Sequence, residues 1–278
     1  MIKVRLKGGL GNQMFQYAVG LSTAMKLETE LILDATSFKS DEKRNYDLGQ
    51  FNISKEKKVI HKMSYLRILS DKLIWKVFNE DYIKSNYDKN YLSIKDQTIL
   101  DGYWQCDKYF SDIEDEIRST FVVKPKKKIA FDRLVDKIDN PNSVSLHIRR
   151  GDYVEKSGQP SSHVLLGLDY YRRAVDIIKQ KIPKIKLWVF SDEPDWVRAN
   201  FKSETPFEVL SDLALFTSAE EMSLMSRCAH NIIANSTYSW WAAWLNNNKE
   251  KIVIAPKLWF LNDGGIDDKR LPTSWDRI

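Results

Sequence analysis

The chain has 278 residues, of which 43% are hydrophobic and 29% are charged. This composition excludes an intrinsically disordered protein and allows one large domain or two of ordinary size. The formal net charge of +5 is too small to indicate nucleic-acid binding. It fits an anionic small ligand, loose attraction to an acidic membrane surface, or ordinary surface charge.

The cysteines and the hydropathy pattern favour a cytoplasmic protein. Cys106 and Cys228 lie far apart and form no C-x-x-C motif, so we expect reduced thiols and neither a zinc site nor a disulfide framework. The N-terminus lacks the apolar region of a secretory signal peptide, and no run of residues is apolar and long enough to span a membrane.

The first 34 residues have the pattern of a β-α-β unit. Apolar and polar residues alternate over 2–6, apolar residues recur at helical spacing over 14–27, and an apolar run over 31–34 is typical of a buried strand. A glycine-rich turn, 8–13, connects the first strand to the helix.

This turn resembles a dinucleotide-binding fingerprint but departs from it. If the fingerprint begins at Gly9, its third glycine falls on Met14, whose size would prevent the close helix–sheet packing that this glycine serves. We therefore disfavour NAD(P). The turn still offers backbone N–H groups and two amide side chains at a helix N-terminus, where they either bind polar or anionic ligand atoms or cap the helix. The residues concerned are Gly9, Gly11, Asn12 and Gln13.

The middle of the chain is less informative. The spacing of apolar residues predicts a helix over 63–78, a strand or turn over 100–105, and an amphipathic helix over 108–121. Tyr103 and Trp104 either stack on a sugar ring or belong to the core. A basic run and a turn cluster bracket a short helix over 129–138, and we place the domain boundary there, giving domains 1–135 and 136–278.

The second half again alternates strands and helices. Together the two halves predict an α/β protein with two Rossmann-like domains that face a cleft. The expected strands are 144–148, 187–190, 230–234 and 252–255, and the expected helices are 170–181, one starting at Pro194, 220–228 and 238–245.

Polar side chains follow three of these strands. If the strands are parallel, their carboxyl ends share one edge of the sheet, where ligands of open α/β sheets bind. The arginines suit a diphosphate, because a guanidinium group binds phosphate oxygens in pairs, and the start of helix 238–245 suits one as well. A carboxylate at the second strand would favour guanine, which presents two N–H donors. Each group also has an ordinary alternative as a helix cap or a solvated arginine. The three groups are His147, Arg149 and Arg150; Ser191, Asp192 and Glu193; and Asn235, Ser236 and Thr237.

Several motifs are missing from the sequence. It contains no Asp-x-Asp, so a metal-bridged nucleotide-sugar site of that kind has no obvious ligands, and we expect no metal. It also contains neither a P-loop motif nor G-x-S-x-G, which argues against a P-loop NTPase and an α/β-hydrolase.

Three sequence blocks, distributed over nearly the whole chain, resemble those of bacterial α-1,2-fucosyltransferases of glycosyltransferase family 11. The blocks are 8–18, 147–154 and 233–245, with weaker matches at 102–105 and 190–192. The resemblance implies a metal-independent, inverting enzyme of the GT-B fold without a cofactor. It would transfer L-fucose from GDP-β-L-fucose to the 2-hydroxyl of a terminal galactoside, such as an O-antigen unit or a histo-blood-group-like glycan. A lipid-linked acceptor would bring it to the inner face of the membrane.

The resemblance places arginine on the diphosphate, so Arg149 would stabilise the leaving group. The base is not settled by it. Asp152 is a candidate because it lies close in sequence to the donor block, whereas Asn12 of the glycine-rich turn can only orient the acceptor hydroxyl, because an amide takes no proton at neutral pH. The expected acceptor contacts are Asn12, Gln13, Tyr103 and Trp104, and the expected donor contacts are His147, Arg149, Arg150, Asp192, Glu193, Asn235, Ser236, Thr237, Ser239, Gly9 and Gly11.

Two alternatives from other classes stay open. The first is an NAD(P)-dependent oxidoreductase that uses the N-terminal β-α-β unit. The second is a non-catalytic sugar-binding protein built on a transferase fold. The sequence makes no prediction of the oligomeric state.

Overall fold

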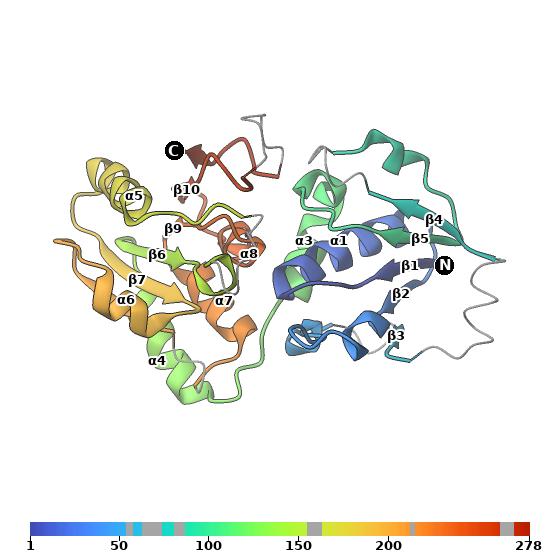
Figure 1. Cartoon of the computed structure of the whole chain (residues 1–278), viewed down its shortest axis with the longest axis horizontal. Coiled ribbons are helices and arrows are strands. Elements are labelled where there is room, and N and C mark those ends of the chain that lie inside the picture. Colours follow the sequence, from blue (N-terminus) through green and yellow to red (C-terminus); the bar gives the residue numbers. More distant parts are fainter. Residues whose placement is uncertain (54–57, 63–73, 81–86, 155–162, 212–214, 262–269) are drawn as a thin grey trace. The chain divides into compact units, whose positions relative to one another are not determined.

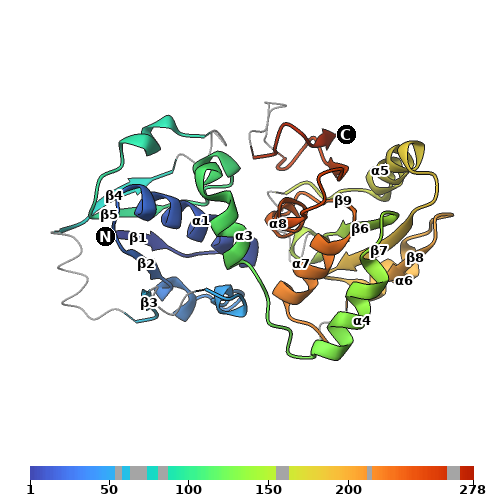
Figure 2. The same ribbon diagram turned by 180° about the vertical axis from the view of Figure 1, so that it is seen from behind.

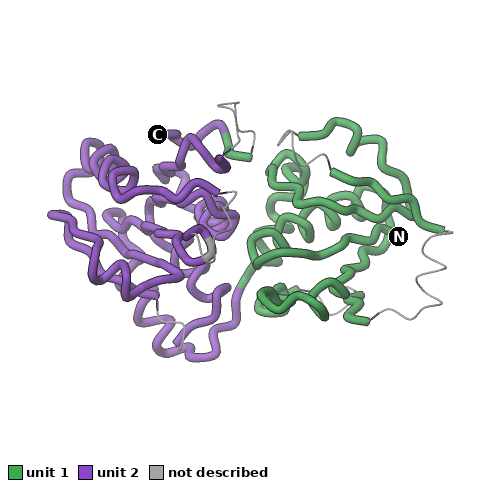
Figure 3. The backbone as a smooth tube through the Cα atoms, in the orientation of Figure 1, with its two compact units in different colours: residues 1–122, 268–272 green, residues 123–267, 273–278 purple. Residues whose placement is uncertain are grey.

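The computed structural model describes residues 1–278 except 54–57, 63–73, 81–86, 155–162, 212–214 and 262–269 (Figure 1). Two compact units make up the chain (Figure 3). Unit 1 comprises residues 1–122 with 268–272, and unit 2 comprises 123–267 with 273–278. Each unit contains a parallel sheet with helices, so the predicted α/β class is confirmed.

Unit 1 is built on a five-stranded parallel sheet of order β3-β2-β1-β5-β4. The predicted β-α-β unit is present as β1, α1 and β2, and every residue of β2 is buried, as expected for a strand inside a parallel sheet. The strands are β1 (Ile2–Arg5), β2 (Leu31–Asp34), β3 (Lys58–Ile60), β4 (Lys76–Asn79) and β5 (Thr98–Asp101), and the α-helices are α1 (Leu10–Lys26) and α3 (Glu114–Thr120).

Helix α1 approaches the sheet most closely at Gly20. A Cβ atom at this position would lie 2.4 Å from Cγ2 of Val4 and 2.8 Å from Cδ1 of Leu31. Met14, which occupies the place of the third fingerprint glycine, is fully buried further back along the same helix. The close-packing glycine therefore sits later in α1 than a dinucleotide fingerprint requires.

Two predictions in unit 1 are only partly met. Most of the helix expected over 63–78 lies outside the described residues (63–73); Ile74 is helical, but the last expected residues form the strand β4, Lys76–Asn79, because they pair with β5. The helix expected from residue 108 starts only at Glu114, after two short 3₁₀ turns at Asp107–Tyr109 and Ser111–Ile113.

Unit 2 has a six-stranded sheet of order β11-β10-β9-β6-β7-β8, with all pairs parallel. All the predicted strands and helices of this half are present, and β8 and β11 are additional. The strands are β6 (Ser143–Ile148), β7 (Lys186–Ser191), β8 (Phe207–Val209), β9 (His230–Ile232), β10 (Val253–Ala255) and β11 (Asp276–Arg277). The helices are α4 (Lys128–Ile138), α5 (Leu168–Lys181), α6 (Pro194–Asn200), α7 (Ser218–Arg227) and α8 (Thr237–Leu245).

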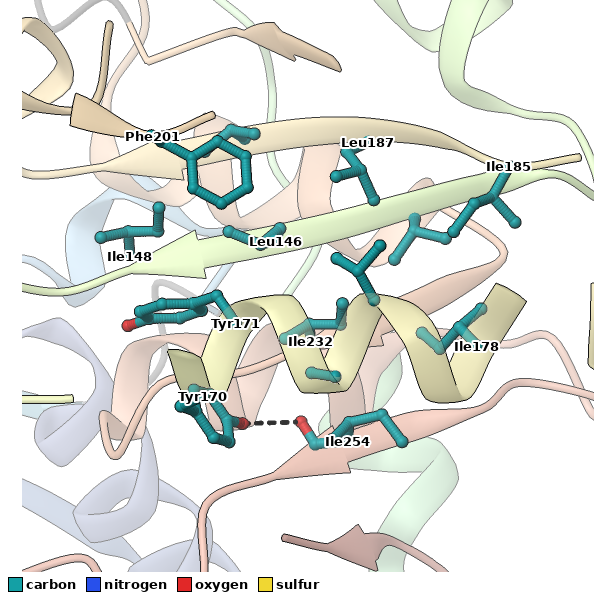
Figure 4. Close-up of a cluster of buried hydrophobic side chains, with 14 of the residues drawn as sticks. Leu146, Ile148, Tyr170, Tyr171, Ile178, Ile185, Leu187, Phe201, Ile232 and Ile254 are labelled. Carbon is teal, nitrogen blue, oxygen red and sulfur yellow. Dashed lines mark hydrogen bonds between the residues drawn. The ribbon is translucent and has the colours of Figure 1, made fainter. Parts of the chain in front are cut away.

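Helices cover both faces of this sheet. On one face, α5 packs against a cluster of apolar residues from β6, β7, β9 and β10 that includes Leu146 and Leu187 (Figure 4). The hydroxyl of Tyr170 donates to the carbonyls of Ile233 at 2.6 Å and Ile254 at 3.3 Å. Helix α7 contacts β6 and β7 and lies beside α4, as Figure 2 shows. All six residues of β6 are consequently buried, including the polar ones that alternation alone would place in solvent.

Two features of unit 2 bear on the predicted domains and on the site. Because α4 packs against α7, it belongs entirely to unit 2, so the units divide after Val122 and the predicted boundary at 135/136 falls inside α4. Helix α8 is apolar on all sides and is buried accordingly. Its indole rings form a cluster with one from the C-terminal segment, comprising Trp240, Trp241, Trp244 and Trp275.

Candidate functional site

The three predicted polar groups lie at one edge of the unit 2 sheet. Strand β6 is the shared neighbour, pairing in parallel with β7, where Ile148 is opposite Ser191, and with β9, where Leu146 is opposite Ile232. The segments that follow these strands therefore leave the sheet side by side.

Asp192 fastens the turn that follows β6. Its Oδ1 accepts a hydrogen bond of 3.0 Å from the backbone N–H of Arg150, and its Oδ2 lies 3.2 Å from Nη1 of Arg149. The turn passes so close to this carboxylate that a Cβ at residue 151 would lie 2.3 Å from Oδ2 of Asp192, which is why Gly151 fits there. Asp192, predicted to contact the nucleotide, thus uses both of its oxygens to hold the turn that contains Arg149 and Arg150 (the arginine turn).

Arg150 is held by Trp196 of α6 and by Glu193, the N-cap residue of that helix. Its Nε lies 3.2 Å from Oε2 of Glu193, and its guanidinium carbon lies 3.5 Å from the ring centroid of Trp196. Arg149 faces Asp192 and lies 5.5 Å from the ring centroid of Tyr153. The two guanidinium groups therefore face two carboxylates, so the strand end is close to electrically balanced.

His147 is buried beneath this turn as a neutral imidazole. Burial, together with the nearby positive charge of Arg149, lowers the pKa of His147 to about 3. Its Nδ1 is buried without a hydrogen-bond partner among the described residues, and its ring centroid lies 5.4 Å from that of Tyr238 in α8. A neutral imidazole offers one donor and one acceptor, so His147 can read a polar ligand edge but adds no charge.

The polar residues that follow β9 are of two kinds: some bond within the protein, and others have side chains that make no capping hydrogen bond. Asn235 is structural, because its Nδ2 donates to the carbonyls of Val164 and Trp259, both at 2.8 Å. Ser239 is also structural, since it is fully buried and its hydroxyl donates to the carbonyls of Ala234, before α8, and of the N-cap residue Ser236. Direct donor contacts were predicted for both residues, and their polar groups are instead used within the protein.

Ser236 and Thr237 differ from these two. Ser236 occupies the N-cap position of α8, yet its side chain makes no capping hydrogen bond. Thr237, the first residue of the helix, is half-buried. The hydroxyls of Ser236 and Thr237 lie at the start of α8, where the N–H groups of the first turn have no partner within the helix. Hydroxyl and N–H donors at a helix N-terminus are typical of phosphate-binding sites.

The structure adds an acid that we did not predict. Glu221 in α7 is buried, and its Oε2 accepts a hydrogen bond of 3.2 Å from Ser211. Burial raises the pKa of Tyr238, and the charge of Glu221 raises it further. Helix α7 packs against α8, and the hydroxyl of Tyr238 donates to the carbonyl of Ser218 in α7 at 2.6 Å. The sequence held a signal: the capping box between Thr217 and Glu220 accounts for one acid and leaves the next one on the buried face of the helix.

In unit 1, the glycine-rich turn is held by its own amide side chains. Gln13 is structural, because its Nε2 donates to the carbonyls of Gly8 and Asn45 and its Oε1 accepts from the backbone of Asp47. The predicted acceptor contact of Gln13 is therefore not supported. Asn12 is half-buried and accepts a 2.9 Å hydrogen bond at Oδ1 from Nε2 of Gln105.

Gly8 and Gly9 serve this turn in different ways. Gly8 adopts a positive φ of 78°, and a Cβ there would lie 2.7 Å from Nδ2 of Asn12, so a side chain would be excluded twice. Gly9 is the N-cap of α1, and the nearest atom to a Cβ at this position would be Nη1 of Arg44, at 3.5 Å. Gly11 is buried inside the first turn of the helix.

The aromatic pair of unit 1 has different roles at its two positions. Trp104 is completely buried, stacks on Phe78, and cannot offer a ring face to a sugar, so its predicted acceptor contact is wrong. It adopts a positive φ of 56°, and Glu80 fixes this turn by accepting the backbone N–H groups of Tyr103 and Trp104 at 2.6 and 2.8 Å. Tyr103 is half-buried, with Nζ of Lys7 5.0 Å from its ring centroid.

The candidate base Asp152 and possible metal ligands are described only in part. The backbone of Asp152 lies in a 3₁₀ turn, Gly151–Tyr153, while its side chain lies outside the described residues. Within the described ranges, no three His, Cys, Asp or Glu side chains gather into a metal-binding group. Among the described residues neither cysteine forms a disulfide, and both are buried.

Comparison with known proteins identifies the family. The family described as glycosyl transferase family 11 matches residues 1–265. The chain belongs to glycosyltransferase family 11. Two Escherichia coli members of similar length are related to it. The O-antigen biosynthesis glycosyltransferase WbnK is 34% identical, over 97% of this chain and 98% of that protein. An α-1,2-colitosyltransferase is 32% identical, over 100% and 99% respectively.

Solved structures agree with this assignment at the level of the fold. A NodZ α-1,6-fucosyltransferase soaked with GDP-fucose aligns with a TM-score of 0.51 and 16% identity, over 88% of this chain and 92% of that one. NodZ from Bradyrhizobium aligns with a TM-score of 0.50. Membership of glycosyltransferase family 11 removes the oxidoreductase alternative, in line with the misplaced fingerprint glycine. No helix among the described residues has the length and hydrophobicity needed to cross a membrane.

Proposed function

We propose that this family 11 glycosyltransferase transfers L-fucose from GDP-β-L-fucose to the 2-hydroxyl of a terminal galactoside, with inversion and without a metal ion. The observation that carries the proposal is the arginine turn after β6, fastened by Asp192, next to the uncapped start of α8. This arrangement supplies guanidinium and backbone N–H donors at one sheet edge, as a diphosphate requires.

Arg149 would stabilise the leaving group. As the bond from fucose to the β-phosphate breaks, the sugar acquires oxocarbenium character and negative charge accumulates on the phosphate. A guanidinium group that is already oriented stabilises this charge without reorganising. Arg150, held by Glu193 and Trp196, would support the turn from behind and have a smaller direct role.

For the guanine base, we add Glu221 as a candidate to the predicted acids Asp192 and Glu193. Asp192 and Glu193 engage the two arginines, and Glu221 accepts from Ser211. Glu221 is buried near Tyr238, which packs on the neutral His147. A carboxylate can accept both N–H donors of the guanine edge, and the imidazole can complete the recognition. Removal of Glu221 should therefore raise the Kd for GDP more than that for a nucleotide that lacks this donor pair, such as ADP.

The proton of the acceptor hydroxyl has no assigned base. Asn12 cannot take it at neutral pH, and Asp152 remains our candidate. A reaction in which the bond to the leaving group is largely broken before attack needs little help from a base, so weak dependence on Asp152 would be consistent with this mechanism.

A second donor calls for a direct comparison, because a relative at 32% identity is named an α-1,2-colitosyltransferase. Colitose is fucose without its 3-hydroxyl. A site that hydrogen-bonds this hydroxyl rejects the deoxy sugar strongly, whereas an apolar site hardly distinguishes the two. The ratio of kcat/KM for GDP-fucose and GDP-colitose therefore decides between two functions that the family allows.

The test is a transfer assay with purified protein. GDP-fucose, GDP-colitose, GDP-mannose and UDP-galactose are offered with a panel of β-galactosides, with and without EDTA, and the linkage is determined by NMR. We expect an α-1,2-fucosylated galactoside at an unchanged rate in EDTA. Exclusive use of GDP-colitose, another linkage, or loss of transfer in EDTA would overturn the corresponding part of the proposal. GDP binding without transfer to any acceptor would support the non-catalytic alternative.

Arg149→Ala, compared with Arg172→Ala on the exposed side of α5, tests the central residue. The first variant should lose about 10²-fold or more in kcat, and the second should stay near the parent. Near-parental turnover of Arg149→Ala would refute its assignment.

A further inference from the structure

We infer that Gln105 is a positioning residue that fixes the side-chain amide of Asn12 in one orientation, so that Asn12 presents a hydrogen-bond donor to the ligand. The inference rests on the proposed transferase function and deepens it. The two residues come from separate sequence blocks that the fold of unit 1 brings together: the glycine-rich turn after β1 and the segment after β5.

The hydrogen bond between the two amides determines which end of Asn12 is free. Nε2 of Gln105 donates to Oδ1 of Asn12 at 2.9 Å. Oδ1 of Asn12 is therefore occupied, whereas its Nδ2 makes no hydrogen bond within the described ranges of the chain. Because an amide has an acceptor end and a donor end, fixing the first assigns the second to the ligand.

Burial confines the side chain of Gln105, which is 9% exposed. Its Oε1 is buried without a partner among the described residues, so the bond from Nε2 to Asn12 is the hydrogen bond that its amide makes there. The turn before it is rigid, since Glu80 accepts two successive backbone N–H groups and Trp104 is buried. Gln16 of α1 ties the same turn to the helix by donating to the carbonyl of Gly102 at 3.0 Å. The amide pair thus joins two segments that are each held independently.

Gly8 packs against the side chain of Asn12 on the side away from Gln105. Any Cβ there would lie 2.7 Å from Nδ2 of Asn12 and 3.3 Å from its Cβ. The Asn12 side chain is thereby packed over the turn on one side and tied to Gln105 on the other. A donor amide of this kind binds an oxygen lone pair, which in the proposed reaction belongs either to the acceptor sugar or to the diphosphate of the donor.

Gln105→Glu, studied as a function of pH, is the main test. An ionised carboxylate cannot donate to Oδ1 of Asn12, so the Asn12 amide turns round and presents its acceptor end. We expect about tenfold lower kcat/KM at pH 8. A protonated carboxyl can donate again, so the loss should shrink as the pH falls towards 5. Gln105→Met, which resembles glutamine in length but cannot donate, should be equally impaired at every pH.

Two further variants guard against loss of the fold. Asn12→Asp keeps an acceptor for Gln105 but removes the donor, so it should reproduce the loss, and its effect should not add to that of Gln105→Glu. Gln180→Glu, an exposed change between two lysines of α5, controls for the added charge and should behave like the parent. Melting temperatures over the same pH range show whether the recovery of Gln105→Glu merely follows its stability.

Calorimetry with GDP and acceptor titrations identify the partner of Asn12. A raised Kd for GDP places Asn12 on the diphosphate, and a raised acceptor KM with unchanged GDP affinity places it on the acceptor sugar; either result supports the inference. Parental kinetics in Gln105→Met, or no recovery of Gln105→Glu at low pH, would overturn it. Failure of the parent protein to transfer any sugar would instead refute the proposed function.

Discussion

Gly151→Ala should disable the site through a neighbouring side chain, without touching the ligand. The added Cβ would lie 2.3 Å from Oδ2 of Asp192 and 3.2 Å from its Cγ, so the carboxylate must move. Asp192 then loses the backbone N–H of Arg150 at 3.0 Å and Nη1 of Arg149 at 3.2 Å. Hydrogen bonds to a charged group contribute about 1.5–3 kcal/mol each, and these groups are roughly one-fifth exposed, which reduces that figure.

We therefore expect transition-state stabilisation to fall by about 2–4 kcal/mol, which lowers kcat/KM for the GDP-sugar by roughly 30- to 1000-fold. Steady-state kinetics measure this loss, and calorimetry with GDP shows how much of it is binding. Gly167→Ala is the matched control, because a Cβ at that position meets nothing within 4 Å. Asp192→Asn, which keeps an acceptor for the N–H of Arg150 but loses the charge, should fall between the parent and Gly151→Ala.

The double variant tests the mechanism of the loss. In an Asp192→Ala background the clash is gone, so Gly151→Ala should add little to the defect. If Gly151→Ala retained parental kcat/KM, or if its effect added fully to that of Asp192→Ala, the role of Asp192 in holding the arginine turn would be refuted.

Three further predictions concern stability. The folded-state pKa of His147, about 3, lies below the ordinary value, so the unfolded chain takes up the proton first and stability falls as the pH drops below about 6.5. Urea unfolding at pH 7.5 and 5.5 should show that His147→Gln abolishes a loss of about 1.4 kcal/mol, and equal pH dependence in both proteins would contradict this. Tyr170→Phe should cost about 1–3 kcal/mol in the same assay, because the Ile233 carbonyl loses its 2.6 Å hydrogen bond; an unchanged unfolding midpoint would exclude that. Gly20→Ala should lower the melting temperature by overpacking α1 against Val4 at a cost of about 1–3 kcal/mol, which a parental melting temperature would disprove.

The fold was predictable where the local pattern agrees with the tertiary structure. The central strands β6, β7 and β9 are apolar runs bounded by turn residues, and α5 has clear helical spacing. The edge strands β8 and β11 were missed because they are short and, unlike the similarly short β9 and β10, do not belong to buried apolar runs: β8 is half-buried throughout and β11 is partly exposed. Strand β4 was assigned as helix because only its pairing with β5 defines it.

The site was predictable as a location but not residue by residue. The sequence indicates that acids and arginines meet at one sheet edge, and the parallel strand order confirms this. It cannot tell whether Asp192 faces a ligand or an arginine, because that depends on a contact across 42 residues. Gln13 and Asn235 look like ligand contacts in sequence, yet their amides bond the backbone of distant segments. Glu221 escaped notice because its neighbour accounts for the visible capping motif.

The indole cluster around α8 also makes unit 2 distinguishable by light. Trp240 and Trp244 stack with their planes 12° apart and centroids 6.2 Å apart, and Trp241 and Trp275 pack against Trp240 at 5.1 and 5.6 Å. Rings this close and rigid couple their electronic transitions, which gives a near-ultraviolet circular dichroism signal that disappears once the packing loosens. In unit 1, the described tryptophans are Trp75 and Trp104. The indole cluster therefore serves as an intrinsic spectroscopic probe of unit 2, which contains the arginine turn and the start of α8. Unfolding of this unit can be followed by near-ultraviolet circular dichroism, separately from the loss of helix content in the far ultraviolet.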